Sequence, residues 1–362
     1  MKLLIAGGGT GGHLFPGIAV AEEFLARKKG NEVLFVGTGK GIEGRVLARL
    51  GYRLECITAA GIRGKGSVDR AKGIAMFLYG YAQSRKILRE FEPDLVLGVG
   101  GYASAPALMA SRGLQIPRFI HEQNAIPGFT NRVLAKVADR IFISLEESRK
   151  FFPGDKTLLT GNPLRRQIVD QVAEPACAER DDNTFHLLVF GGSSGAHRIN
   201  LTMVEALSYL KPVHGKLAIT HQTGEKDLED VHEAYQEAGF AADVVPFIDS
   251  MADAYRWADL LICRAGATTI AEVTACGKPC IFIPYPHAVD DHQRKNAEAL
   301  LKCGAGFVII EQELTAELLA SSICELMDDP ARLRATGEAA RGLARLDAAK
   351  VMVDEMLKSR KP

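Results

Sequence analysis

The feature that most constrains this chain is an apolar, strand-like run that ends in a glycine cluster and leads into a helical pattern. It occurs twice, as KLLIA before GGGTGGH (7–13) and as HLLVF before GGSSGAH (191–197). Glycine lets the backbone approach an anion closely, and the following helix start offers free N–H groups and a positive dipole end. The sequence therefore predicts two units of one plan, each opening with an anion-binding turn.

Short apolar runs alternate with longer helical patterns in both halves, which is typical of a parallel sheet with crossover helices. The runs are KLLIA, EVLFVG, RLECITA, PDLVLGVGG, PRFIHEQN and DRIFIS in the first half, and HLLVFGG, GKLAITHQTG, ADVVPFID, ADLLICRAG, KPCIFIPYP and GFVII in the second. Helices are expected at 251–257, 267–276 and 315–327. We expect an α/β fold of two doubly wound, Rossmann-like domains that face a deep cleft, with functional residues on the loops that follow strands.

The chain length of 362 residues also suggests two domains. The segment GNPLRR (161–166) and the polar stretch 170–184 are interpreted as hinge and connector. We expect an N-terminal domain at 1–161, a C-terminal domain at 162–340 and a last helix, within 341–362, that packs back on the N-terminal domain.

Bulk composition narrows the class of protein. Residues 1–160 hold 23 Lys and Arg against 14 Asp and Glu, whereas residues 161–362 hold 21 against 30, so the first half has the positive excess. This asymmetry indicates an anionic partner for the first half, such as a phosphate-bearing lipid or an acidic membrane, although a solvated imbalance gives the same count. No run approaches the roughly 18 apolar residues of a spanning helix, so a cytoplasmic protein is expected. The seven cysteines include no CxxC pair, which favours reduced packing residues over disulfides or metal ligands.

Gly7, Gly9 and Gly12 satisfy the GxGxxG spacing of a dinucleotide site, which makes a nicotinamide-dependent dehydrogenase one alternative. Such a site also needs an acidic residue at the end of the second strand to hold the ribose diol. Here that strand ends in Gly37-Thr38, so the alternative is disfavoured and only the anion-binding property of the loop is retained.

In the second half, RAGATTIAE (264–272) predicts a strand-to-helix turn whose small residues suit a phosphate. Glu272 lies about one turn into that helix, where it can bind a ribose diol or simply favour the helix dipole. Arg165, at the hinge, can bind a diphosphate through its planar fork of donors, or be solvated. The polar run HAVDDHQRKN (287–296) suits a sugar. A metal at Asp290, Asp291 and His292 is the alternative to it, but the chain has no strand-end DxD motif, so no metal or other cofactor is predicted.

The region 61–91 mixes basic residues with more apolar side chains than one amphipathic stripe requires. A patch that rests on an anionic bilayer and a buried crossover helix both fit this pattern. The residues predicted for the membrane surface are Ile74, Phe77, Leu78, Tyr81, Lys72 and Arg85.

Nine motifs in consistent order resemble the peptidoglycan N-acetylglucosaminyltransferase family (MurG), and they cover nearly the whole chain. They are GGGTGGHLFPGIAVA, GIRGKG, GVGGYAS, HEQNAIPGFTN, GNPLRR, GGSSGAHRIN, FIDSMADAYRWADL, CRAGATTIAEV and PHAVDDHQRKNA. One departure is Ser194, which stands where the family loop commonly has glutamine in GGSQGA.

The resemblance implies a GT-B fold and an inverting transfer of GlcNAc from UDP-GlcNAc to undecaprenyl-pyrophosphoryl-MurNAc-pentapeptide (lipid I), which forms β-1,4-linked lipid II for the cell wall. It implies a peripheral position on the inner face of the bacterial membrane, with an acceptor-binding N-terminal domain and a donor-binding C-terminal domain. Other cell-wall synthesis or division proteins are further expected partners, and nucleic acid is not. The implied donor residues are Thr10, Gly11, Gly12, Asn124, Arg165, Ser193, Ile248, Ala267, Thr268, Thr269, Ile270, Ala271, Glu272 and Gln293. The implied acceptor residues are Gly9, Thr10, Gly100, Gly101 and Tyr102.

The catalytic base stays open between two residues. His13, at the mouth of the first glycine loop, can accept a proton at neutral pH because an unperturbed histidine titrates near pH 6.5. Glu122 is the competitor, since a desolvated carboxylate can act as a base or can position other groups. Other UDP-sugar enzymes of the same fold, such as a glycolipid transferase or a UDP-GlcNAc 2-epimerase, and a non-catalytic nucleotide-sugar or lipid-pyrophosphate binder or scaffold, are the alternative functions.

Overall fold

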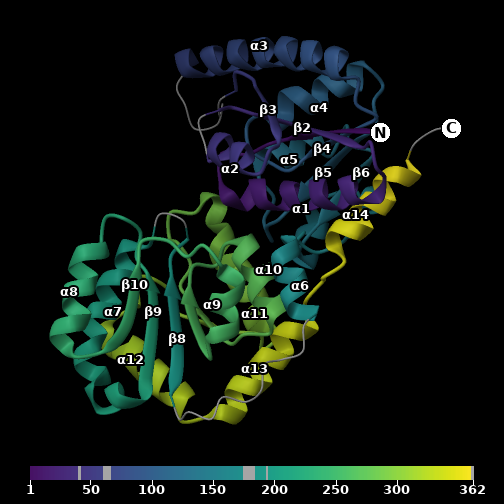
Figure 1. Ribbon diagram of the computed structural model, residues 1–362. Coiled ribbons are helices and arrows are strands. Elements are labelled where there is room, and N and C mark those ends of the chain that lie inside the picture. The colour runs from purple at the N-terminus through teal and green to yellow at the C-terminus, as the bar shows by residue number, and fades with distance from the viewer. Residues whose placement is uncertain (40–41, 60–66, 174–183, 193–194, 360–362) are drawn as a thin grey trace. The chain divides into compact units, whose positions relative to one another are not determined.

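A computed structural model describes residues 1–39, 42–59, 67–173, 184–192 and 195–359, with the side chains of 67–71 left out. The chain forms two compact units, one of residues 1–166 with 345–362 and one of residues 167–344 (Figure 1). Each unit is built on one parallel sheet, so the two doubly wound domains predicted from the sequence are confirmed.

The first unit contains a seven-stranded sheet of order β3-β2-β1-β4-β5-β6-β7. Its strands are β1 (Lys2–Ala6), β2 (Glu32–Gly37), β3 (Arg53–Cys56), β4 (Leu95–Gly98), β5 (Arg118–Glu122), β6 (Arg140–Ile143) and β7 (Thr157–Leu159). Its helices are α1 (Gly11–Arg27), α2 (Glu43–Arg49), α3 (Ser67–Phe91), α4 (Ser104–Gly113), α5 (Phe129–Leu134) and α14 (Ala348–Lys358).

The strand order reverses between β1 and β4, which are hydrogen-bonded neighbours. Both faces of β1 are buried, because Leu4 belongs to one core cluster and Leu3 and Ile5 belong to the other. Each such side chain stabilises the fold by about 1.5–3 kcal/mol relative to an exposed one. The reversal leaves a crevice at the carboxyl ends of β1 and β4, where α/β proteins bind ligands.

The last helix packs on the first unit. Met352, Val353 and Met356 of α14 join the core cluster that includes α1, and Arg27 pairs with Asp354 at 2.8 Å. Figure 1 shows α14 beside α1. The chain therefore ends on the unit in which it began.

The second unit contains a six-stranded sheet of order β10-β9-β8-β11-β12-β13. Its strands are β8 (Phe185–Phe190), β9 (Leu217–Gln222), β10 (Ala241–Val245), β11 (Leu260–Cys263), β12 (Cys280–Phe282) and β13 (Phe307–Val308). Its helices are α6 (Arg166–Ala173), α7 (His197–Leu210), α8 (Leu228–Ala238), α9 (Met251–Trp257), α10 (Ala267–Cys276), α11 (His292–Lys302), α12 (Ala316–Met327) and α13 (Pro330–Gly342). Here the order reverses between β8 and β11, so the crevice of this unit lies at their carboxyl ends.

Candidate functional site

Two glycine loops meet at the crevice of the first unit. A Cβ on Gly7, after β1, would lie 2.4 Å from the carbonyl oxygen of Gly100, after β4, and a Cβ on Gly101 would lie 2.6 Å from the carbonyl oxygen of Gly8. Because the loops are this close and all four residues have positive φ, glycine is required at each of them. Together these loops contain the acceptor residues expected from the sequence, including Tyr102, whose side chain is 59% exposed.

His13 lies in the first turn of α1, against the second glycine loop. A Cβ on Gly100 would lie 2.6 Å from His13 Nδ1, so the imidazole ring packs over that backbone. The ring is half-buried. This arrangement places one titratable side chain beside both glycine loops.

A buried polar network supports the loop that contains Gly100. Gln123 donates from Nε2 to the Val99 carbonyl at 2.7 Å and to His121 Nδ1 at 3.1 Å, while His121 Nε2 lies 3.0 Å from Ser144 Oγ. Burial, together with the nearby charge of His13, lowers the pKa of His121 to about 3. His121 is therefore neutral at physiological pH and acts here as a structural group.

Glu122 is buried at the end of β5, and its carboxylate organises the loop that follows. Oε1 accepts the N–H of Asn124 at 3.0 Å and its side-chain amide at 3.3 Å, and Oε2 accepts the Gly128 N–H at 3.2 Å and the Asn131 amide at 2.9 Å. Burial raises the pKa of Glu122, and these hydrogen bonds oppose that rise. Four hydrogen bonds to one carboxylate favour a positioning role for Glu122. They also fix the backbone of Asn124, which is expected to bind the sugar donor.

Arg165 lies near the end of the 1–166 segment of the first unit, beside α1. Its guanidinium stacks over the ring of Phe15 with 4.8 Å to the centroid. The stacking holds the planar fork near the helix start that also carries His13.

A carboxylate that the sequence reasoning missed lies at the end of β2. Glu43, the first residue of α2, accepts the Gly9 N–H at 3.0 Å and the Thr38 hydroxyl at 3.3 Å. Burial would raise its pKa, but hydrogen bonds from its own N–H and those of Gly9 and Thr38 lower it overall. The carboxylate that the sequence appeared to lack near Gly37 is therefore present, but it binds backbone and side-chain donors of the protein.

In the second unit the glycine loop after β8 packs against the loop after β9. Gly195 has φ +74°, and a Cβ there would lie 1.7 Å from the carbonyl oxygen of Thr223. Ser193, an expected donor residue, and Ser194 lie outside the described residues.

The other loop at this crevice leads from β11 into α10. Gly266 is the N-cap residue with extended backbone, so the N–H groups of Ala267, Thr268 and Thr269 begin the helix without intrahelical acceptors. Within the described residues, the buried Thr268 Oγ1 has no hydrogen-bond partner. These groups suit a phosphate or another anion.

Glu272 lies further along α10 and is only 4% exposed, as is typical of a carboxylate with a dedicated partner. Its Oε2 accepts a hydrogen bond at 3.0 Å from the phenol of Tyr255, a fully buried residue of α9. Burial and the charge of Glu272 raise the pKa of Tyr255 well above its usual value. Tyr255 is thus a further site residue that the sequence reasoning did not single out. Two expected donor residues, Ile270 and Ala271, lie in the helical turn between Thr269 and Glu272.

The remaining expected donor residues lie on neighbouring loops of this unit. Ile248 is half-buried between β10 and α9. Gln293 accepts the Tyr285 N–H at 3.0 Å through Oε1 and so closes the loop that follows β12.

Asp290 and Asp291 in that loop have φ of 53° and 54°, a strained conformation often found at functional sites. Among the described residues, no group of three His, Cys, Asp or Glu is placed to hold a metal.

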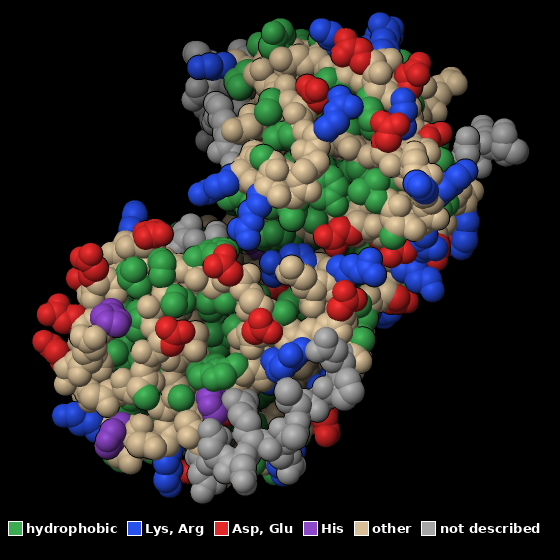
Figure 2. Space-filling view, viewed as in Figure 1, with side chains coloured by type: hydrophobic (Ala, Val, Ile, Leu, Met, Phe, Trp, Pro, Cys, Tyr) green, Lys and Arg blue, Asp and Glu red, His purple; other side chains and the backbone are tan. Residues whose placement is uncertain are grey.

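Helix α3 carries the surface predicted for a membrane. Ile74 and Leu78 are 53% and 60% exposed, and Lys72 and Arg85 are also exposed. Figure 2 shows hydrophobic, basic and acidic side chains interspersed along the edge of the first unit that α3 forms. Phe77 is half-buried.

The prediction for Tyr81 needs correction. Its side chain packs against the core cluster of the first unit, and a Cβ on Gly113 of α4 would lie 3.2 Å from its hydroxyl. The sequence pattern could not show which face of α3 packs inward. In the structure this face contains the buried Gly80, where an added Cβ would lie 2.3 Å from the Thr58 carbonyl oxygen. No described helix has the length and apolarity needed to cross a bilayer.

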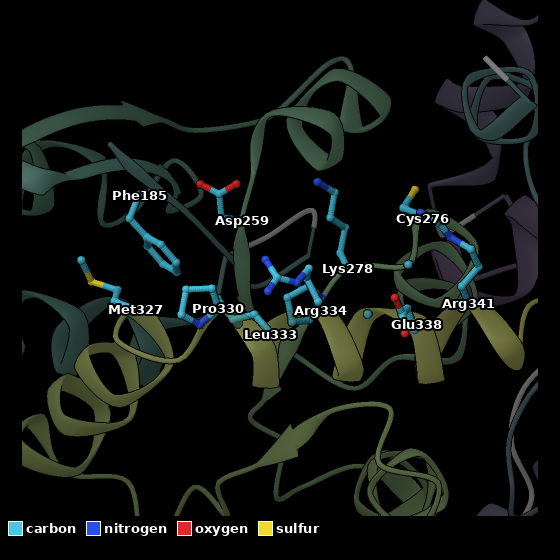
Figure 3. A pocket seen from close by; sticks show the side chains of 13 residues that line it. Phe185, Asp259, Cys276, Lys278, Met327, Pro330, Leu333, Arg334, Glu338 and Arg341 are labelled. Atoms are coloured by element: carbon cyan, nitrogen blue, oxygen red, sulfur yellow. The ribbon is translucent and has the colours of Figure 1, made fainter. Parts of the chain in front are cut away.

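A pocket of about 450 Å³ lies elsewhere on the second unit (Figure 3). Phe185, Asp259 and Lys278, which line it, precede or begin strands, so the pocket is at the amino ends of the sheet. Arg334 and Arg341 of α13 line its other side. Since ligands of doubly wound sheets bind at the carboxyl ends, we do not assign the substrate to this pocket.

Two sequence profiles of one family match the chain. The glycosyltransferase family 28 N-terminal domain matches residues 3–143, and the glycosyltransferase family 28 C-terminal domain matches residues 186–352. Together they span most of both units.

Similar whole proteins agree with these matches. The UDP-N-acetylglucosamine–N-acetylmuramyl-(pentapeptide) pyrophosphoryl-undecaprenol N-acetylglucosamine transferase of Geobacter sulfurreducens is 81% identical over 359 residues, 99% of each chain. The crystal structure of Acinetobacter baumannii MurG is 32% identical, covers 99% of each chain and has a TM-score of 0.78. The UDP-GlcNAc 2-epimerase of Neisseria meningitidis covers 99% of this chain and 100% of its own with a TM-score of 0.70, but at 14% identity it shares the fold alone. The chain belongs to glycosyltransferase family 28 and, within it, to the MurG family of undecaprenol-linked N-acetylglucosamine transferases.

Proposed function

We propose that the chain transfers N-acetylglucosamine from UDP-GlcNAc to lipid I and forms β-1,4-linked lipid II in peptidoglycan synthesis. The observation that carries this proposal is the 81% identity, over 99% of both chains, to a relative whose name states this transfer. The enzyme is a hexosyltransferase.

The donor is proposed to bind the crevice of the second unit. Main-chain groups of Ile248 would bind uracil, Glu272 would bind the ribose hydroxyls, and the α10 start at 267–269 would bind the diphosphate with Ser193 and Arg165. Support comes from the orphan helix N–H groups at Ala267 and from the Tyr255 phenol that fixes one oxygen of Glu272. Asn124 and Gln293 would bind the sugar hydroxyls.

The acceptor pyrophosphate is proposed to bind the glycine loops of the first unit, in keeping with the positive excess of residues 1–160. His13 would remove the proton from the attacking hydroxyl as that oxygen displaces UDP from the anomeric carbon in one step. Its place beside both loops supports this role, whereas the four hydrogen bonds that Glu122 accepts support positioning of the 124–131 loop. Helix α3 would rest on the anionic inner face of the cell membrane through Ile74, Leu78 and Phe77, with Lys72 and Arg85 beside them.

UDP release tests the function directly. The assay compares UDP-GlcNAc with UDP-glucose and UDP-galactose, each with and without a short-chain lipid I analogue. We expect release only with UDP-GlcNAc and the analogue together. Conversion of UDP-GlcNAc without acceptor would select an epimerase, and tight UDP-GlcNAc binding without release would select a non-catalytic binder.

A further inference from the structure

The first glycine loop has little intrinsic means of keeping one conformation. Gly7, Gly8 and Gly9 have φ of 150°, 130° and 89°, and no side chain of the loop itself restricts them. Glycine also loses the most conformational freedom on ordering, so a loop of three glycines must be held by its neighbours.

The first of the three is held by backbone. The Gly7 N–H donates to the Val36 carbonyl at 3.0 Å. Gly8 packs against the second glycine loop, since a Cβ on Gly101 would lie 2.6 Å from the Gly8 carbonyl oxygen. Gly9 is held by Glu43, whose Oε2 accepts the Gly9 N–H at 3.0 Å and whose carboxyl carbon would lie 3.2 Å from a Cβ on Gly8.

Glu43 is suited to this task by its own surroundings. It is 1% exposed, packs at the end of β2 where a Cβ on Gly37 would lie 3.2 Å from its Cγ, and accepts the Thr38 hydroxyl. A buried, ionised carboxylate makes stronger hydrogen bonds to N–H groups than a neutral acceptor does. The hydrogen bond to Glu43 also occupies the Gly9 N–H. An anion at this loop would therefore be bound by the amides that follow Gly9.

We propose that Glu43 is a positioning residue for the acceptor: it fixes Gly9 and packs against Gly8, so that the backbone from Thr10 to His13 is presented to the acceptor pyrophosphate. The inference rests on the proposed function for the identity of that acceptor. Glu43 touches no substrate and acts through the loop.

The test compares Glu43→Gln with Asp94→Asn. Asp94 Oδ2 accepts the Lys2 N–H at 2.8 Å, so it makes the same kind of bond at the opposite end of β1 and provides a matched control. With a lipid I analogue, we expect E43Q to raise the acceptor KM about tenfold, the size expected for one hydrogen bond to a charged group. The donor KM should rise less, because only Thr10, Gly11 and Gly12 of this unit's loop are also expected donor residues. D94N should leave both KM values within about twofold of wild type, a limit well below that effect.

Hydrogen exchange of the peptide that spans residues 7–13 gives a second readout that needs no acceptor. We expect exchange in this peptide to be at least about tenfold faster in E43Q than in wild type, and unchanged in D94N, because the amide that Glu43 protects would open. A wild-type enzyme that fails to use the analogue would reject the proposed function while this measurement still tests Glu43. Equal rises of donor and acceptor KM, or unchanged exchange in E43Q, would overturn the positioning role.

Discussion

Tyr255→Phe removes one hydroxyl from the second unit and leaves its packing nearly unchanged. The phenol donates to Glu272 Oε2 at 3.0 Å, and both residues are buried. A hydrogen bond to a charged group stabilises a fold by about 1.5–3 kcal/mol, so we expect a loss of that order in the free energy of unfolding.

The effect on nucleotide binding is smaller, because the bond is present before UDP arrives. Without it, Glu272 has to be ordered when the ribose binds, which costs about 0.5–1.5 kcal/mol for a flexible side chain. We therefore expect the Kd for UDP to rise about two- to tenfold. The Kd for 2′-deoxy-UDP should rise less, since that ligand has lost one of the two hydroxyls that Glu272 would bind.

Isothermal titration with UDP and 2′-deoxy-UDP measures both changes. Tyr235→Phe is the control, because Tyr235 is also fully buried in the second unit and its phenol pairs with His221 Nδ1 at 3.1 Å. This variant should lose stability and keep wild-type affinity for both ligands. If Y255F discriminated between the two nucleotides as well as wild type does, neither the ribose assignment of Glu272 nor the positioning role of Tyr255 would stand.

Three further changes test other parts of the molecule. His13→Ala should lower kcat about 100- to 10,000-fold with both KM values nearly unchanged, as measured by UDP release, and a wild-type kcat would exclude His13 as the base. Ile74→Asp with Leu78→Asp should weaken flotation with anionic vesicles at least about tenfold while turnover of a short-chain soluble acceptor persists, and loss of both would indicate a structural role for α3 instead. Burial lowers the pKa of His221 to about 3, although the charge of Asp227 opposes this shift. Between pH 6.5 and 3, His221 is therefore protonated in the unfolded chain and neutral in the folded chain. Urea unfolding of wild type should therefore lose up to about 1.4 kcal/mol per pH unit from this residue as pH falls below 6.5, and a slope unchanged in His221→Gln would refute the assignment.

Local patterns were enough to predict the sheets and several helices of this chain. The expected helices at 251–257 and 267–276 match α9 and α10, because capping residues and glycine mark their ends in the sequence itself. The short strand β7 (Thr157–Leu159) was not predicted, since three residues carry too little periodicity to distinguish a strand from a loop.

Residues that act through tertiary contacts were harder to find. Glu43 and Gly9 are separated by 34 positions in the sequence, and Tyr255 and Glu272 by 17. Contacts between residues so far apart cannot be predicted from a local pattern. Tyr81 illustrates the reverse error, because an aromatic residue among cations resembles a membrane contact until the packing of α4 is known. The sequence therefore predicted where the glycine loops lie, whereas Glu43 and Tyr255, which support neighbouring residues, were found only from the structure.

The two glycine loops share one local design, yet different groups hold them. In the second unit, Gly195 lies directly against the Thr223 carbonyl oxygen, so this loop is positioned by backbone of the neighbouring strand end. In the first unit, backbone contacts hold Gly7 and Gly8, but the Gly9 N–H is bound by the carboxylate of Glu43, a single side chain from a short helix. Since a backbone contact survives most substitutions and a side-chain contact is lost with one, the Gly9 end of the first loop should be more sensitive to mutation of its support than Gly195 in the second loop. Glycine loops of one local design can thus be supported by different groups, and the residues that support them have to be found in each unit separately.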